Sequence, residues 1–328
     1  MTTRRHILIA LGAYLAGPMH PVNAQQRIAR VGWLMTTTAG SFAEITSRGF
    51  IKGLAEAGYV EGKNLVLERR SADGDINRFP ELARDLVKAQ IEVFFAPAKP
   101  MADAAWYASR AIPTVIATVT DPIAVQYAKS LARPGLHITG VTTANVELIG
   151  KRLQMLTDLL PKIKRVAVLI DESLLRSCRE EMKQADAAAA ILGLTLIRVS
   201  ASRREELEAA FVRAVRLKAQ ALMTLPMTSN HDWMQAVADQ GVKHRMAVMH
   251  DVSIVVAGGG LISYGPDFED IFRRAGHYVA RILKGEKPAG MAIEEPREFV
   301  LSVNLKAAKA LGITIPPTIM VLANRVFE

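Results

Sequence analysis

Two observations in the sequence predict an α/β protein made of two similar lobes, each with a parallel sheet. A pattern of strand, helix end and proline-ended strand occurs twice, about 130 residues apart. The matching segments are 30–34 with 165–169, 57–59 with 192–194, and 93–97 with 222–226. Short apolar runs also alternate with helical patterns along the chain, which is typical of parallel strands buried on both faces. Two such sheets enclose a ligand cleft if the carboxyl ends of their strands face each other.

Short apolar runs are the expected strands, and helical periodicity fills the segments between them. The apolar spacing from Phe42 to Leu54 predicts a helix that ends before Gly58. The spacing from Leu207 to Val215 predicts another. The expected strands are 29–35, 64–70, 91–96, 113–118, 138–142, 164–170, 194–199, 220–225, 246–249, 261–264 and 298–303.

The amino terminus predicts export. Arg4 and Arg5 precede an apolar run at 7–16, and the small residues of 22–24 resemble an A-x-A cleavage site. Residues 1–24 are therefore expected to be a signal peptide, and the mature protein to lie in the periplasm. The paired arginines also resemble a twin-arginine export signal, with Sec export as the alternative. No later run approaches the ~20 apolar residues of a membrane span, so we expect no membrane insertion of the mature chain.

Composition narrows the class of protein further. Cys178 is the single cysteine, so no internal disulfide forms, and a small apolar residue on a helix is its expected role. The formal charge of +9 is spread along the sequence, which favours a soluble protein that binds no nucleic acid. The length suits two domains. We expect the protein to be a monomer.

The sequence lacks the motifs that common cofactors and catalytic nucleophiles require. The glycine run 258–260 has no dinucleotide-binding spacing and precedes a strand, and no phosphate loop or G-x-S-x-G elbow occurs. The histidines between 231 and 277 show no metal-ligand spacing. His250-Asp251 at a strand end could be half of an acid/base pair, but nothing supplies a nucleophile. We expect no cofactor, no metal and no enzymatic activity.

Polar residues follow the expected strands of the first lobe, at the edge that would face a cleft. The loop 35–41 opens a helix whose free N–H groups suit a carboxylate, and one of its hydroxyls is expected to cap that helix. Asp121 either caps a helix that begins at Pro122 or holds the ammonium group of a ligand. The candidate ligand-binding residues of this lobe are Met35, Thr36, Thr37, Ala98, Lys99, Thr120 and Asp121.

The second lobe offers the equivalent strand ends. Its candidate ligand-binding residues are Asp171, Met227, Thr228 and Asp251. The chain is expected to cross between the lobes near 140–146 and again near 265–266, because no linker separates independent modules. Thr142 and Tyr264, beside these crossings, complete the candidate site.

The carboxyl-terminal part of the chain carries a recognisable signature. The segments Leu261 to Asp267 and Ile282 to Pro288, with Tyr278-Val279 between them, resemble the tryptophan-binding-protein-like family of ABC transporter substrate-binding proteins. The resemblance extends over essentially the whole mature chain, through 54–64, 121–122, 130–135, 150–153, 304–312 and 315–317.

That resemblance implies a type I periplasmic binding fold, in which two Rossmann-like lobes joined by a three-segment hinge hold a ligand between them. It also implies amino acids, notably aromatic ones, as ligands and an inner-membrane ABC permease as partner. Two segments depart from the family pattern. The loop 96–100 contains Lys99 where relatives have a small neutral loop, and 36–39 replaces a Ser-Pro-Gly type of loop. Lys99 is expected to favour an anionic group, with an outward-facing rim lysine as the alternative.

The expected function is capture of a small solute, amino-acid-like or carboxylate, in the interlobe cleft and its delivery to an ABC importer. A periplasmic sensing subunit for a membrane receptor is the alternative, and an enzyme on the same lobes is a third hypothesis. The first lobe is expected to comprise residues 27–142 with part of 265–328. The second is expected to comprise 143–263, with part of 298–328 open to either lobe.

Overall fold

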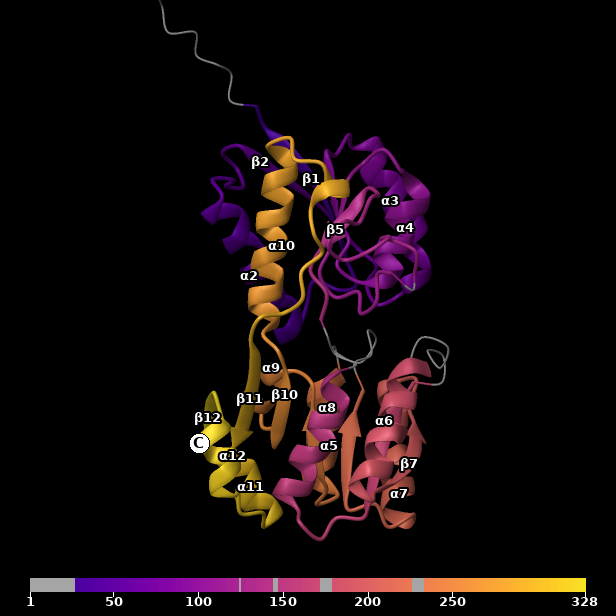
Figure 1. Cartoon of the computed structure of the whole chain (residues 1–328), viewed down its shortest axis with the longest axis vertical. Helices are drawn as coiled ribbons and strands as arrows, with labels where there is room; N and C mark the ends of the chain where they lie inside the picture. The colour runs from indigo at the N-terminus through magenta and orange to yellow at the C-terminus, as the bar shows by residue number, and fades with distance from the viewer. Residues whose placement is uncertain (1–26, 124, 144–146, 172–178, 226–232) are drawn as a thin grey trace, which may run out of the picture.

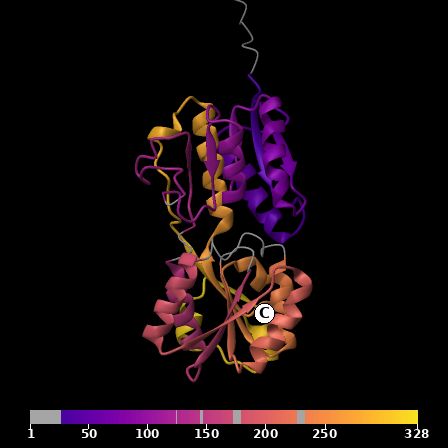
Figure 2. The same ribbon diagram turned by 90° about the vertical axis from the view of Figure 1, so that its right-hand side faces the viewer.

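The computed structural model of the chain describes residues 27–123, 125–143, 147–171, 179–225 and 233–328. These residues fold into two α/β lobes that lie one above the other in both views (Figure 1, Figure 2). Each lobe has its own sheet, and strands β3 and β8 lie in different sheets. The predicted fold class is confirmed. The expected signal peptide and the candidate residues Met227 and Thr228 lie outside the described residues.

The first lobe contains a sheet of five parallel strands in the order β2-β1-β3-β4-β5. Strands β1, β3, β4 and β5 are almost wholly buried, as helices on both faces require, whereas the edge strand β2 is mostly half-buried. Its elements are β1 (Ala29–Met35), α2 (Ser41–Glu56), β2 (Leu65–Ser71), η1 (Ile76–Arg78), α3 (Phe79–Lys88), β3 (Val93–Phe95), α4 (Lys99–Ala108), β4 (Thr114–Ile116) and β5 (Ile138–Gly140).

The second lobe contains a larger sheet, in the order β12-β11-β10-β9-β8-β6-β7. Strand β11 runs antiparallel to β10, so this sheet is mixed rather than wholly parallel. Its elements are α5 (Leu148–Leu159), β6 (Arg165–Ile170), α6 (Arg179–Leu192), β7 (Thr195–Ser200), η3 (Arg204–Glu206), α7 (Leu207–Arg216), β8 (Ala221–Thr224), α8 (Met234–Lys243), β9 (Ala247–His250), α9 (Ser253–Ala257), β10 (Ile262–Pro266), β11 (Phe299–Asn304), α11 (Leu305–Leu311), α12 (Pro317–Leu322) and β12 (Arg325–Phe327).

The expected strands are confirmed to within two residues at their amino ends. Strand β12 was not predicted, because its three residues are half-exposed and carry no continuous apolar run. The predicted helices are present as α2 and α7. Val215 departs from the predicted apolar stripe of α7, since it is 47 % exposed.

Helix α10 (Phe268–Leu283) follows β10 of the second lobe but packs against α2 of the first lobe (Figure 1). Three glycines make this close packing possible, and a Cβ atom at the first of them, Gly49, would lie 2.4 Å from the carbonyl oxygen of Glu269. A Cβ atom at Gly53 would lie 1.9 Å from the carbonyl oxygen of Arg273, and one at Gly276 would lie 2.5 Å from that of Phe50. After α10 and the short turn η5 (Pro288–Gly290), the chain returns to the second lobe as β11.

The chain therefore crosses between the sheets three times: after β5, between β10 and α10, and before β11. At the first two crossings it leaves one lobe from the carboxyl end of a strand. Because the other strands of each sheet, apart from β11 and β12, run parallel to β5 or β10, their carboxyl ends face the opposite lobe. This is the arrangement that a cleft between two open sheets needs.

Candidate ligand-binding cleft

The hydroxyl-rich loop of the first lobe follows β1 at this edge. Met35 is buried, and Thr36 and Thr37 are half-buried. The Thr37 hydroxyl accepts the Ala39 N–H at 3.1 Å and so closes a turn inside the loop. The expected hydroxyl cap is wrong, because Gly40 occupies the N-cap position of α2 and no side chain caps this helix. The first N–H groups of α2 therefore have no side-chain acceptor at the N-cap.

Lys99 is the first residue of α4, directly after Ala98. Its ammonium group lies 2.6 Å from the Asp103 carboxylate, one helical turn further on. The Tyr127 hydroxyl donates a hydrogen bond to the same carboxylate. The pKa of Tyr127 is raised, mainly because the hydroxyl is buried and also because of this hydrogen bond. The charge of Lys99 is thus balanced within its own helix. The i, i+4 spacing of Lys99 and Asp103 could have indicated this pairing from the sequence.

Thr120 and Asp121 follow β4. Thr120 is half-buried and Asp121 is exposed. An Asp121 carboxylate oxygen accepts the Ile123 N–H at 3.0 Å. Pro122 begins a series of turns, with its carbonyl accepting the Tyr127 N–H, and not a helix among the described residues. The alternative in which Asp121 caps a helix is therefore wrong, because no helix begins there among the described residues. Its carboxylate instead accepts a backbone hydrogen bond from the residue two positions later and so closes a turn.

The two hinge candidates lie on different crossings. Thr142 is buried, and its N–H donates to the Glu294 carbonyl at 2.8 Å, which joins the first crossing to the third. Tyr264 is partly buried in β10, and its carbonyl accepts a hydrogen bond from the Arg152 guanidinium at 2.7 Å. Arg152 belongs to α5, so this bond joins the helix after the first crossing to the strand before the second.

The second lobe buries charged groups at its cleft edge. Asp171 follows β6 and is 2 % exposed, and Asp251 follows β9 and is fully buried. Both carboxylate oxygens of Asp251 lack a hydrogen-bond partner within the described part of the chain. Arg152 is also fully buried; burial lowers its pKa, and the nearby Asp251 and Tyr264 oppose that change.

Next to Asp251 lies a row of buried polar side chains that no sequence pattern grouped together. His250 on β9 pairs with Ser263 on β10, and Ser263 pairs with Ser302 on β11. All three are fully buried, and no partner for their polar atoms occurs among the described residues. Burial lowers the pKa of His250 to about 4, with Asp251 opposing the change, so the imidazole is neutral at pH 7.

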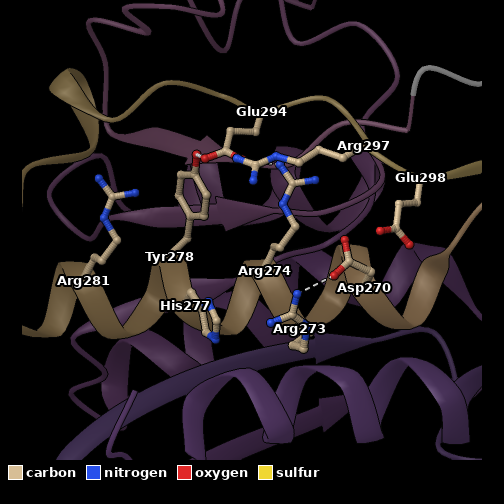
Figure 3. A pocket seen from close by; sticks show the side chains of 9 residues that line it. All are labelled: Asp270, Arg273, Arg274, His277, Tyr278, Arg281, Glu294, Arg297 and Glu298. Atoms are coloured by element: carbon tan, nitrogen blue, oxygen red, sulfur yellow. Dashed lines mark hydrogen bonds and ion pairs between the residues drawn. The ribbon is translucent and has the colours of Figure 1, made fainter. Parts of the chain in front are cut away.

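A separate pocket of about 370 Å³ lies between α10 and the third crossing (Figure 3). Glu294 lines it and accepts hydrogen bonds from Arg274, Arg297 and Tyr278. Burial alone would raise the pKa of Glu294, but the bonds and charge of Arg274 hold it below its usual range. The pocket contains none of the predicted ligand-binding residues, and its arginines already have carboxylate partners. We therefore interpret these side chains as a network that joins α10 to the third crossing, and not as a ligand-binding site.

The described residues include no group of three His, Cys, Asp or Glu side chains that could hold a metal ion. No helix within them is both long and apolar enough to cross a membrane.

A family model for ABC transporter substrate-binding proteins matches residues 39–327, which is nearly all of the described chain. The chain belongs to this family. Members bind small ligands for ABC transporters, and those of importers work in the periplasm or outside the cell. The predicted family and the substrate-binding function are confirmed.

Individual relatives are distant. A tyrosine-binding protein from Clostridioides difficile is 25 % identical over 81 % of this chain and 76 % of its own length. A Vibrio cholerae conserved domain protein is 25 % identical over 92 % of this chain and all of its own, with a TM-score of 0.84. A Streptococcus pneumoniae ABC domain in complex with L-Trp is 24 % identical over the same shares, with a TM-score of 0.83.

Proposed function

We propose that this substrate-binding protein captures an amino acid between its lobes in the periplasm and passes it to an inner-membrane ABC permease. The observation that carries this proposal is Asp251, whose buried carboxylate has no hydrogen-bond partner among the described residues. The nearby Arg152 offsets part of its charge but donates no hydrogen bond to it among the described residues, and the ammonium group of an amino acid would supply the missing hydrogen bonds.

The first lobe supports the other end of such a ligand. Helices α2 and α4 both begin at the cleft edge, and neither has a side-chain cap. Free N–H groups and the positive end of the helix dipole suit a carboxylate. Because Lys99 is already paired with Asp103, the helix starts are better candidates for a carboxylate than the lysine. A zwitterion therefore fits this cleft better than a simple carboxylate.

Relatives indicate which amino acids to test first. One is named for tyrosine binding and another is in complex with L-Trp, so aromatic amino acids lead the series. The lobes would close by rotation about the three crossings. Residues 27–142 and α10 would move as one body, and residues 143–263 with β11 to β12 as the other. The protein would act as a monomer without catalysis, after export through the signal in residues 1–24, with the twin-arginine route as one option.

Calorimetric titration with L-tryptophan, tryptamine and indole-3-propionate tests this function. Asp251→Asn should weaken binding of the two amines about 10- to 150-fold, the loss of a charged hydrogen bond, and leave the deaminated acid unchanged. Asp121→Ala should cause a loss of the same order, if Asp121 contacts ligand. Equal binding of all three compounds by the wild-type protein, or unchanged amine affinity in Asp251→Asn, would exclude the ammonium site. Mass spectrometry of the co-purifying ligand would identify the natural solute.

A further inference from the structure

The end of the second lobe that lies away from the cleft gathers three segments, 160–165, 213–220 and 241–247, which we call the base edge. They lead into β6, β8 and β9, which are neighbours in the sheet. The Gln220 side chain accepts the Lys164 N–H at 2.7 Å, and Arg165 donates to the Leu217 carbonyl at 3.0 Å. The segments therefore lie side by side, at the lower end of the molecule in Figure 1.

The base edge is strongly cationic. It contains eight Lys and Arg residues and no Asp or Glu, while the whole chain has 41 basic and 32 acidic residues, an excess of 9. The rest of the sequence is thus nearly balanced, with 33 basic and 32 acidic residues. Lys243 pairs with Glu208, and no ion pair of the others occurs among the described residues. The basic residues are Lys162, Lys164, Arg165, Arg213, Arg216, Lys218, Lys243 and Arg245, and all but Arg165 are exposed.

Two of these cations occupy a backbone conformation that favours glycine. Lys218 and Arg245 follow the ends of α7 and α8 with φ values of 59° and 51°. At the corresponding end of α6, which leads into the neighbouring strand β7, the residue is Gly193, with φ 64°. A left-handed conformation is unfavourable for a side chain with a Cβ atom, and helices usually end in glycine there. The chain keeps a cation at both strained positions.

Aliphatic side chains accompany the charges. Val215 and Val242 lie within the base edge and Ile191 is in the last turn of α6 beside it, and all three are exposed. The exposed large apolar side chains of these segments include no aromatic residue. Aromatic anchors, which are common at the centre of protein interfaces, are thus missing from the exposed apolar side chains of the base edge, although it does contain arginines. A surface of anionic phosphates suits its many cations, and aliphatic side chains beside them can enter the headgroup region.

We propose that the base edge binds the surface of a membrane that contains anionic phospholipid. Each Lys or Arg near such a surface strengthens binding by about fivefold, so several together give reversible attachment. The attraction falls with salt, because exposed charges are screened. This proposal is independent of the ligand in the cleft, since the base edge lies at the opposite end of the second lobe.

Sedimentation with vesicles tests it, using phosphatidylcholine with and without phosphatidylglycerol, at low and high salt. The wild-type chain should bind only the anionic vesicles and should dissociate at high salt. The double variant Lys218→Gly/Arg245→Gly should bind about 25-fold more weakly, without a lower melting temperature, since glycine favours the left-handed conformation. Every variant keeps the same residues 1–26, so any contribution from them cancels.

The matched control is Lys63→Ala/Arg84→Ala, which removes two exposed cations from the first lobe and should bind like the wild type. Equal binding of both vesicle types would overturn the proposal. A double glycine variant that loses thermal stability but still binds the vesicles would assign the cations to the helix ends alone. Retention on polyglutamate without any vesicle binding would assign the base edge to an acidic protein, and would also contradict it.

Discussion

The two lobes share a fold but fill their interiors differently. In the first lobe, aromatic rings pack together behind the sheet, and Phe50 stacks on Phe95 with ring centroids 3.8 Å apart. Trp33 and Phe272 lie against the same ring. In the second lobe, buried charges and polar groups lie under the carboxyl edge of the sheet, around Arg152. Both lobes have apolar cores, but only in the second do buried charges near the cleft edge also have to balance each other.

The sharpest test of that contrast removes the buried cation. Arg152→Met should lower the free energy of unfolding by about 3 to 5 kcal/mol, because it leaves the buried charge of Asp251 without its nearest cation. Urea denaturation measures this. Lys151→Met, one residue away on the exposed face of α5, should change it by less than about 0.5 kcal/mol.

A coupled variant refines the Arg152 experiment. Arg152→Met/Asp251→Asn should recover part of the lost stability, because the second substitution removes the Asp251 charge that the first leaves without a cation. If the double variant is no more stable than Arg152→Met alone, the two groups do not balance each other and the electrostatic account of the second lobe is wrong.

Acid should weaken the second lobe through His250. Burial lowers the pKa of this imidazole to about 4, whereas it is near 6.5 in an unfolded chain. Below pH 6.5 the unfolded state binds the proton and the folded state does not, so stability falls as the pH falls from 6.5 to 4, by roughly 3 kcal/mol. His250→Leu should remove this part of the slope. Identical slopes for the variant and the wild type would contradict it.

The next test compares glycines in helices of the two lobes. Gly53→Ala should destabilise the protein by about 1 to 3 kcal/mol, because its Cβ would meet the Arg273 backbone at 1.9 Å. Gly150→Ala in α5 is the matched control, since its Cβ would lie 3.6 Å from the Ala188 Cβ, an ordinary contact. Because alanine favours the helix more than glycine does, Gly150→Ala should raise the free energy of unfolding by about 0.5 to 1 kcal/mol. Equal losses at both sites would show that the α2–α10 contact is not unusually close.

Much of the fold could be predicted from the sequence because buried parallel strands leave continuous apolar runs. The sequence also predicted a crossing back to the first lobe near 265–266. The close approach of α10 to α2 could not be predicted, since it depends on backbone contacts at Gly53 and Gly276 that no local pattern encodes. Nor could the cationic base edge, because its three segments are spread along the chain and meet only through sheet order. In the candidate site, strand ends indicated where polar groups lie, but not that Asp251 is buried and Lys99 is paired.

The smallest expected effect is at Lys99, where the first lobe does carry charge near the cleft. A half-exposed i, i+4 ion pair contributes about 0.3 to 0.5 kcal/mol, so Lys99→Ala should change stability by no more than that. Because Asp103 already balances the ammonium group, the affinity for a carboxylate ligand should change by less than about threefold. Asp103→Ala is the informative partner variant: it frees the lysine and should raise carboxylate affinity only if Lys99 reaches the ligand. Calorimetry with indole-3-propionate measures both. A large loss in Lys99→Ala, with a salt dependence to match, would restore the lysine as an anion-binding residue and make the first lobe, like the second, electrostatically tuned.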